Sequence, residues 1–266
     1  MKHIMIDAYG CQTSNTDNLW DVYEAIVDII NTLGLKAIMP PQLVPYHFCE
    51  NQDDRGISAF VLLNGGHFTI HTFPVYGCYF VDLLLDENYA NNQLEKCLQA
   101  WFPCTDMFSK VADRDESEAK DFYSYSPYND FGPHYMFRVR MENQPTLDWM
   151  SNFLDRMPPK ADMSPITRPC VLKSQIENPE YISGIILIAE SHIALHYNVE
   201  TKFLYMDVFS CKGVGPAFDS VIKEMLPAGY EQLLTRRGRR NEDRKNTLSD
   251  RAKKHKDWQQ VIRHNS

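Results

Sequence analysis

The chain has 266 residues, of which 44% are hydrophobic and 23% charged, and its formal net charge is −8. This is an ordinary soluble composition, with length for one large domain or two of moderate size. No apolar run approaches the ~20 residues of a membrane-spanning helix, and the first residues lack a signal-peptide pattern, so we expect a cytoplasmic protein without a membrane partner. The seven cysteines are scattered, without a Cys-x-x-Cys pair, which favours thiols over a zinc or disulfide framework.

Charge is distributed unevenly along the chain. Residues 236–266 hold 11 Lys and Arg against 4 Asp and Glu, a net charge of +7, so residues 1–235 carry −15. An acidic body could attract a cationic substrate, although the same surplus of acid also serves solubility alone. The basic segment could contact nucleic acid or an acidic partner, but a solvated extension is the simpler interpretation, and nucleic acid is not an expected partner.

The first part of the chain predicts a strand, a helix, a strand, a hairpin and a second helix. The opening strand is His3 to Tyr9, and a helix follows from about Asp17 to Leu33. The apolar face expected for this helix is the stripe Leu19, Tyr23, Ile26, Val27 and Ile30. The elements expected next are a strand at 58–63, a hairpin at 66–85 and a helix near 92–101.

The same order of elements returns after residues 113–131, a polar and turn-rich stretch that is typical of a linker. The second set of expected elements is a strand at 134–141, a helix at 146–156, a strand at 183–188, a hairpin at 190–211 and a helix at 217–226. The order alone indicates a duplication, which the residues can test.

Residues 64–71 line up with residues 189–196 at a constant offset of 125 positions. The same offset joins four further pairs without a gap, namely Ile57 with Ile182, Ser58 with Ser183, Leu62 with Leu187, and Asp82 with Asp207. The chain is therefore predicted to contain an internal repeat.

The repeat divides the chain into a first unit at 1–112, a linker at 113–131, a second unit at 132–238 and a basic tail at 239–266. A sheet with helices on one face buries only that face, so two such units packed sheet to sheet would bury the other. The predicted fold class is α+β, with two repeated β-sheet and helix units forming a sandwich of helices, sheet, sheet and helices.

The second hairpin carries the most chemistry. Apolar and polar residues alternate from Ser191 to Tyr197, and a β-rich run at 203–209 follows the turn-like residues 198–202. If the hairpin is symmetric about Thr201, Ser191 and Cys211 face each other, with Cβ atoms roughly 4.5–5.5 Å apart. A hydroxyl and a thiol would then share one small volume.

This segment resembles a known self-processing sequence. Glu190-Ser191-His192-x-x-x-His196, with a Glu four residues later and Cys211 twenty residues after the Ser, resembles the pyruvoyl-dependent S-adenosylmethionine decarboxylases of bacteria and archaea. The opening residues 3–11 look like the start of those enzymes too. They consist of one such unit and pair as dimers, whereas this chain is similar to two fused units, as in the eukaryotic relatives with their αββα sandwich.

The resemblance implies that Ser191 Oγ attacks the Glu190 carbonyl and that the resulting ester eliminates. The protomer would then hold two fragments, 1–190 and 191–266, with a pyruvoyl group made from Ser191 as its cofactor. That carbonyl would form a Schiff base with the α-amine of a small amino-acid-type substrate and accept electrons as carbon dioxide leaves. The first unit has Gly66 and Asp86 at the serine and cysteine positions, so only the second unit can be processed.

The position of His196 argues against its serving Ser191. The two residues are five apart, so on a regular strand they lie on opposite faces and roughly 16 Å from each other. A histidine from the partner unit, packed face to face, could reach instead. A twist or a bulge in the hairpin would let His196 serve Ser191 within its own unit, and this alternative stays open.

In the fused eukaryotic relatives the site is composite. The resemblance then implies that Ser58 and His71 of the first unit assist cleavage at Ser191, while Cys211 reprotonates the substrate α-carbon as a general acid. The residues left to line a defunct second site would be Ser183, His196 and Glu200, near Gly66 and Asp86.

A metal site is not expected from the histidine spacing. His67 and His71 are four residues apart, as are His192 and His196, which on a helix would suit zinc. On strands this spacing is roughly 13 Å, too long for one ion with bonds of about 2 Å.

Two features leave the substrate open. In the family a Glu four residues after the processing His binds the ribose hydroxyls, and Glu200 holds that place in the second unit, but the first unit has Val75. A composite site would lose this acceptor, which costs about 1–3 kcal/mol. Phe48 is a candidate for stacking on the adenine, if residues 53–54 are an insertion.

The favoured function is therefore S-adenosylmethionine decarboxylation in spermidine and polyamine biosynthesis. Decarboxylation of arginine or ornithine on the same scaffold is the alternative, and a non-catalytic paralogue partnering an active subunit is a third. The retention of Glu190, Ser191 and Cys211 argues against the third, because a dead copy is free to lose them. Whether the processed protomer forms a homodimer stays open.

Overall fold

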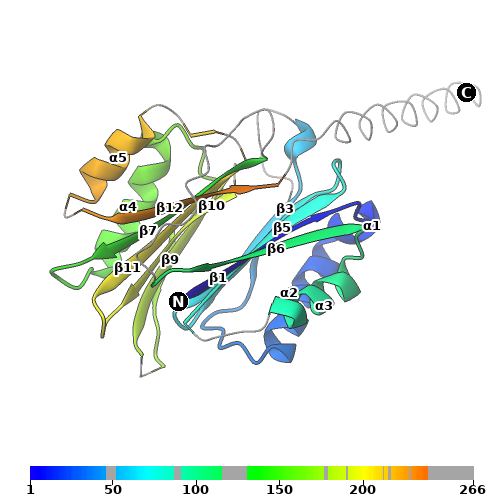
Figure 1. Ribbon diagram of the computed structural model, residues 1–266, viewed down its shortest axis with the longest axis horizontal. Coiled ribbons are helices and arrows are strands. Elements are labelled where there is room, and N and C mark those ends of the chain that lie inside the picture. The colour runs from blue at the N-terminus through cyan, green and yellow to red at the C-terminus, as the bar shows by residue number, and fades with distance from the viewer. Residues whose placement is uncertain are drawn as a thin grey trace, which may run out of the picture.

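The computed structural model describes residues 1–45, 52–86, 91–115, 131–176, 179–189, 191–211, 213–214, 217–227 and 229–238. In these residues the chain forms two six-stranded sheets, and each sheet comes from one half of the sequence (Figure 1). None of the helices in these ranges has the length and apolar character that a membrane crossing requires.

The first sheet has the antiparallel order β2-β3-β4-β5-β1-β6. Its strands are β1 (Lys2–Tyr9), β2 (Gln42–Pro45), β3 (Ile57–Leu63), β4 (Gly66–Phe73), β5 (Cys78–Leu85) and β6 (Asp106–Asp113). The helices of this half are α1 (Thr13–Thr16), α2 (Leu19–Thr32), the single 3-10 turn η1 (Gln52–Asp54) and α3 (Asn91–Trp101).

The second sheet repeats that order, as β8-β9-β10-β11-β7-β12. Its strands are β7 (Gly132–Arg140), β8 (Cys170–Lys173), β9 (Tyr181–Ile188), β10 (Ser191–Asn198), β11 (Phe203–Ser210) and β12 (Glu231–Arg237). The helices of this half are α4 (Leu147–Lys160) and α5 (Phe218–Met225). Strand for strand the halves correspond, and the predicted α+β class with two repeated units is confirmed.

The two sheets face each other, and the helices cover their outer faces (Figure 1). Strand β3 shows how the sequence specifies this, because all seven of its residues are buried. Ala59 and Val61 pack in the core under α2 and α3, whereas Phe60 and Leu62 meet Ile185, Leu187 and Ala194 of the second sheet. Apolar residues on both faces of a strand are expected when both faces are covered.

Helix α2 shows where the predicted stripe is wrong. The buried face is Val22, Ala25, Ile26, Ile29 and Ile30, which shares only two members with the predicted stripe. Leu19 is 43% exposed because it lies in the first turn, directly after the N-cap Asn18, whose side chain accepts two backbone N–H groups. The small Ala25 packs against the sheet, and hydrophobicity alone gives such a position too little weight.

Four strands were missed by sequence reasoning, namely β2, β6, β8 and β12. They lie at the edges of the sheets, where two are only four residues long and β6 is mostly exposed. An edge strand buries little, so its sequence lacks the apolar alternation that marks a strand.

The predicted linker begins too early, and the basic run 236–266 begins inside the folded core. Strand β6 runs to Asp113, and Arg114 is only 5% exposed, so the first residues of the predicted linker 113–131 belong to the folded core. Strand β12 includes Arg236 and Arg237, and Arg237 is fully buried rather than solvated. The rest of both segments, 116–130 and 239–266, lies outside the described residues.

Candidate active site

Ser191 begins β10, and its register differs from the predicted one. It pairs with Ser210 of β11, not with Cys211. The difference arises in the turn, where four residues, 199–202, separate the strands, while symmetry about Thr201 requires an odd number. Lys202 ends the turn with a φ of 61° and donates its N–H to the Asn198 carbonyl. Cys211 therefore follows directly after the strand.

Cys211 lies where the two sheets meet, a contact region that we call the seam. It packs against a cluster of buried residues from both sheets, which comprises Phe73, Cys78, Phe80, Phe131 and Phe209, with Tyr9 and Tyr76 beside them. The cysteine of the second half therefore meets the first half directly, in apolar surroundings.

The backbone of Ser191 is strained. Its φ is 150°, its exposed fraction is 2%, and its Oγ has no hydrogen-bond partner in the described part of the chain. A non-glycine residue in such a conformation costs of order 1–3 kcal/mol, and a buried unpaired hydroxyl costs about 1–3 kcal/mol more. Both costs at one residue are typical of a functional site, because packing alone would select against them.

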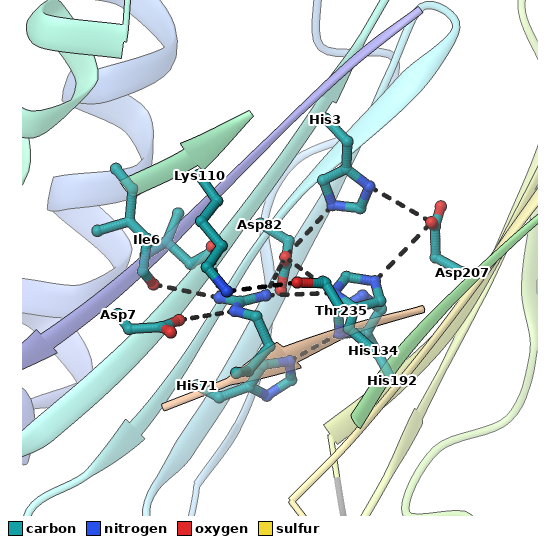
Figure 2. Close-up of polar contacts among 12 residues, drawn as sticks. His3, Ile6, Asp7, His71, Asp82, Lys110, His134, His192, Asp207 and Thr235 are labelled. Carbon is teal, nitrogen blue, oxygen red and sulfur yellow. Dashed lines mark hydrogen bonds and ion pairs between the residues drawn. The ribbon is translucent and has the colours of Figure 1, made fainter. Parts of the chain in front are cut away.

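His71 of β4 reaches across the seam to the residue after Ser191. Its Nδ1 lies 3.0 Å from Ser58 Oγ. Its Nε2 lies 2.9 Å from His192 Nδ1 (Figure 2). The two imidazole rings are stacked, with centroids 5.2 Å apart and planes inclined by 10°. We call this region, with Ser58, His71, Ser191 and Cys211, the serine end of the seam.

The opposite region, with Gly66, Asp86, Ser183 and His196, is the glycine end. There His196 Nδ1 lies 2.9 Å from Ser183 Oγ, and His196 Nε2 lies 2.8 Å from His67 Nδ1. The structure thus places His71 against His192, the residue after Ser191. His196 is instead hydrogen-bonded to Ser183 and His67 at the glycine end. Which histidine serves Ser191 in the reaction stays a prediction.

Tyr181 fills the glycine end. Its ring is so close to Gly65 that a Cβ there would lie 2.6 Å from it. Its hydroxyl donates to Asp86 Oδ2 at 2.5 Å and accepts from Asn198 Nδ2 at 2.7 Å. At the offset of 125 the counterpart of Tyr181 is Gly56, which has no side chain that could fill the serine end in this way.

The predicted substrate-binding residues lie apart. Val75 is half-buried in the turn between β4 and β5, at the serine end, whereas Glu200 is exposed in the turn between β10 and β11, at the glycine end. The serine end therefore receives no carboxylate from Glu200. Two other predicted residues, Phe48 and Glu190, lie outside the described residues.

Between the two ends lie two buried arginines that sequence reasoning missed. Arg114 follows β6 of the first half and binds Asp207 and two backbone carbonyls of the second half. Arg237 ends β12 of the second half and binds Asp82, Asp7 and two carbonyls of the first half, with Nε 2.6 Å from Asp7 Oδ1. A usable signal existed, because the paired carboxylates Asp82 and Asp207 sit on buried strands and need cationic partners.

These charges set the pKa values in the seam. Burial alone would raise the pKa of Asp207 and of Asp82, but Arg114 beside the first and Arg237 beside the second hold both well below their usual value. Burial would likewise lower the pKa of His3, yet its contacts with Asp207 and Asp82 leave it raised (Figure 2).

For four other histidines of the seam the pKa shifts in the opposite direction. Burial lowers the pKa of His67 to about 4. Burial also lowers the pKa values of His134, His192 and His196 well below 6.5. These rings are therefore neutral near neutral pH and can each donate and accept one hydrogen bond.

One group in the seam has the donor atoms of a metal site. His3, Asp82 and His134 each offer an atom within 4.8 Å of the others. The guanidinium of Arg237 already binds Asp82 and lies 3.2 Å from His134 Nδ1, so a metal ion would meet a fixed positive charge. The group suits an arginine better than a cation.

We expect acid to destabilise the protein below pH 6.5. In that range the unfolded chain protonates His67, His134, His192 and His196 while the folded chain does not. The free energy of unfolding should fall by up to about 1.4 kcal/mol per pH unit for each such histidine. His67 stops contributing below about pH 4.

His3 acts in the opposite sense, because its raised pKa stabilises the fold below pH 6.5 and this contribution is lost as the pH rises through the raised value. Urea unfolding at pH 7, 6 and 5 tests the sum, since the midpoint should drop steeply between pH 6 and 5. A midpoint independent of pH over this range would contradict the neutral, buried histidines.

The chain is similar in sequence to S-adenosylmethionine decarboxylases. The S-adenosylmethionine decarboxylase family profile matches residues 2–115 and 142–238. An S-adenosylmethionine decarboxylase proenzyme from a Thermoanaerobacter species is 31% identical over 104 residues, which cover 37% of this chain and 78% of that protein. The S-adenosylmethionine decarboxylase proenzyme 2 of Halalkalibacterium halodurans is 29% identical over 104 residues, covering 37% and 76%.

Among solved structures, the adenosylmethionine decarboxylase of Aquifex aeolicus is similar to part of the chain. The match has a TM-score of 0.37 and 21% sequence identity, and it covers 46% of this chain and 96% of that one.

Proposed function

The chain belongs to the S-adenosylmethionine decarboxylase family, whose profile matches both halves, and from that premise we propose that it is a precursor that cuts itself between Glu190 and Ser191. The product is a pyruvoyl-dependent decarboxylase with S-adenosylmethionine as its substrate. The observation that carries the proposal is the strained backbone of Ser191, whose Oγ lacks a hydrogen-bond partner among the described residues, at the same end of the seam as the hydrogen-bonded pair His71 and Ser58.

The proposed cleavage changes the bonds around Ser191 in a fixed order. Its Oγ bonds to the Glu190 carbonyl carbon, the C–N bond between the two residues breaks, and the nitrogen gains a proton. Loss of the Ser191 α-proton then breaks the Cβ–O bond and releases the Glu190 carboxylate. Water replaces the nitrogen, ammonia leaves, and a ketone remains at position 191. The strain in φ is relieved once the peptide bond breaks, which favours the forward direction.

The proton transfers fall to residues of the first half. We assign His71 and Ser58 to them, because their hydrogen-bonded pair contacts His192, the residue that follows Ser191 in the chain. General acid–base help of this kind contributes about 10²–10⁴ to a rate. Ser183 and His196 are left without a role in cleavage, since the glycine end offers no serine or cysteine at positions 66 and 86.

For the decarboxylation the pyruvoyl carbonyl supplies the electron sink. The chain's part is to bury position 191 and to hold the half-buried Cys211 against apolar rings. We assign the general-acid role to this thiol, which would deliver a proton to the substrate α-carbon.

The substrate assignment is tested by carbon dioxide release. Processed protein is incubated with carboxyl-labelled S-adenosylmethionine, arginine and ornithine in parallel, and kcat/KM for S-adenosylmethionine should exceed the others by at least about tenfold. Val75→Glu and Glu200→Val form a matched pair of variants. The first places a carboxylate at the serine end and should lower KM for S-adenosylmethionine, while the second should leave KM unchanged.

Two results would reject the assignment. Preference for arginine or ornithine would keep the chemistry but replace the substrate, as the missing carboxylate at Val75 would then explain. A chain that stays uncut and releases no carbon dioxide from any of the three would indicate a non-catalytic partner subunit instead.

A further inference from the structure

Two matched chains of hydrogen bonds cross the seam. At the serine end the chain runs from Ser58 through His71 to His192, with separations of 3.0 and 2.9 Å. At the glycine end its counterpart, Ser183, His196 and His67, has separations of 2.9 and 2.8 Å. In both chains the first two members come from one half and the third from the other, so the third member is available only when the halves are packed together.

The two contacts of His71 constrain each other, because a neutral imidazole carries its proton on one nitrogen only. If His71 Nε2 donates to His192 Nδ1, then His71 Nδ1 has a lone pair that can take the Ser58 hydroxyl proton. If His192 donates instead, His71 Nδ1 holds a proton and cannot accept one. The role of His192 therefore decides whether His71 can act as a base toward Ser58.

His192 is suited to the accepting role. Burial, with the neighbouring His71 ring, keeps the pKa of His192 well below 6.5, so it presents a neutral ring to His71. In this tautomer Nε2 carries the proton, and it has no hydrogen-bond partner within the described ranges. The rings of His67 and Phe209 meet His192 edge to face at 5.3 and 6.1 Å, and an aromatic face is a weak acceptor for an N–H.

We propose that His192 is a positioning residue for self-cleavage, which accepts a hydrogen bond from His71 Nε2 and thereby leaves His71 Nδ1 unprotonated toward the Ser58 hydroxyl. It acts through His71, as the third member of a serine, histidine and acceptor chain orients the base in other enzymes. The inference rests on the proposed function, and it adds a residue beyond the serine, histidine and cysteine that the sequence points to.

The experiment follows cleavage over time on denaturing gels after cell-free translation of the full chain. His192→Leu removes the acceptor, and His192→Asn keeps a polar atom close to the place of Nδ1. His67→Leu is the matched control, because it removes the counterpart of His192 from the glycine end at equal burial. His71→Leu and His196→Leu report which histidine serves the cleavage.

His192→Leu should slow cleavage by about tenfold or more, while His192→Asn recovers most of the rate and His67→Leu stays within about twofold of the parent. A thermal midpoint measured for each variant separates slow chemistry from poor folding, and the two leucine variants should match in it. Equal rates in His192→Leu and His67→Leu would overturn the role, as would an Asn variant no faster than the Leu variant.

Failure of the proposed function gives a different pattern. A parent chain that never breaks would overturn both the cleavage and the role of His192. A parent that breaks normally, with only His196→Leu impaired, would move the site to the second half's own histidine and reject His192 as its support.

Discussion

The Ser191→Ala variant is expected to remain a single chain of 266 residues and to release no detectable carbon dioxide. Alanine has no Oγ, so no ester can form and no ketone can arise at position 191. Intact mass spectrometry of the parent should instead show fragments 1–190 and 191–266. The second fragment should be lighter by one ammonia than the same fragment with an N-terminal serine, which distinguishes this route from simple hydrolysis.

The control is Ser183→Ala, which removes a buried serine hydroxyl hydrogen-bonded to His196 at the glycine end and should leave cleavage intact. Strain is tested by comparing Ser191→Gly with Ser191→Ala. Because φ is 150° at this residue, glycine should be the more stable of the two uncut variants by about 1 kcal/mol. Cleavage in either variant, or greater stability of the alanine form, would contradict the proposed state of Ser191.

Much of the fold could be predicted because duplication and alternation are written in the residues. The offset of 125 that joins Ser58 to Ser183 also joins strands of equal place in the two sheets. Parity predicted that Ser191 and His196 lie on opposite faces of their strand; His196 is hydrogen-bonded to Ser183 at the glycine end, and which histidine serves Ser191 stays a prediction. The face-to-face packing was predicted because helices cover only one face of each sheet, and strands such as β3 and β9 are buried along their whole length.

The parts that could not be predicted depend on small or long-range effects. The number of residues in the turn decides whether Ser191 faces Cys211 or Ser210, because a difference of one residue shifts the pairing by one. Composition does not reveal this number. Arg237 lies in a basic run that is typical of a solvated tail, and only the carboxylates of the other half make its burial favourable. Propensity within a segment carries no information about such distant partners.

Replacing Arg237 with methionine should destabilise the protein by about 3–5 kcal/mol, since it leaves buried carboxylates without their cation. Asp82 is fully buried, which by itself would raise its pKa, and the charge of Arg237 holds that pKa low. Urea unfolding is best measured in the Ser191→Ala chain, where a single uncut polypeptide gives an interpretable transition. Arg114→Met should act similarly, because it removes the arginine that binds Asp207.

Two further variants make this test specific. Arg168→Met removes an arginine that is 90% exposed and pairs with Asp155 on the surface, and its unfolding midpoint should match the parent. Asp82→Asn added to Arg237→Met should recover part of the loss, because the cost arises from the unpaired charge and not from the lost side chain. If Arg237→Met unfolds at the parent's midpoint, Arg114 and Arg237 do not hold the two halves together. The apolar contacts of the seam would then be enough to do so. If the double variant recovers nothing, the loss reflects packing of the guanidinium stem rather than charge.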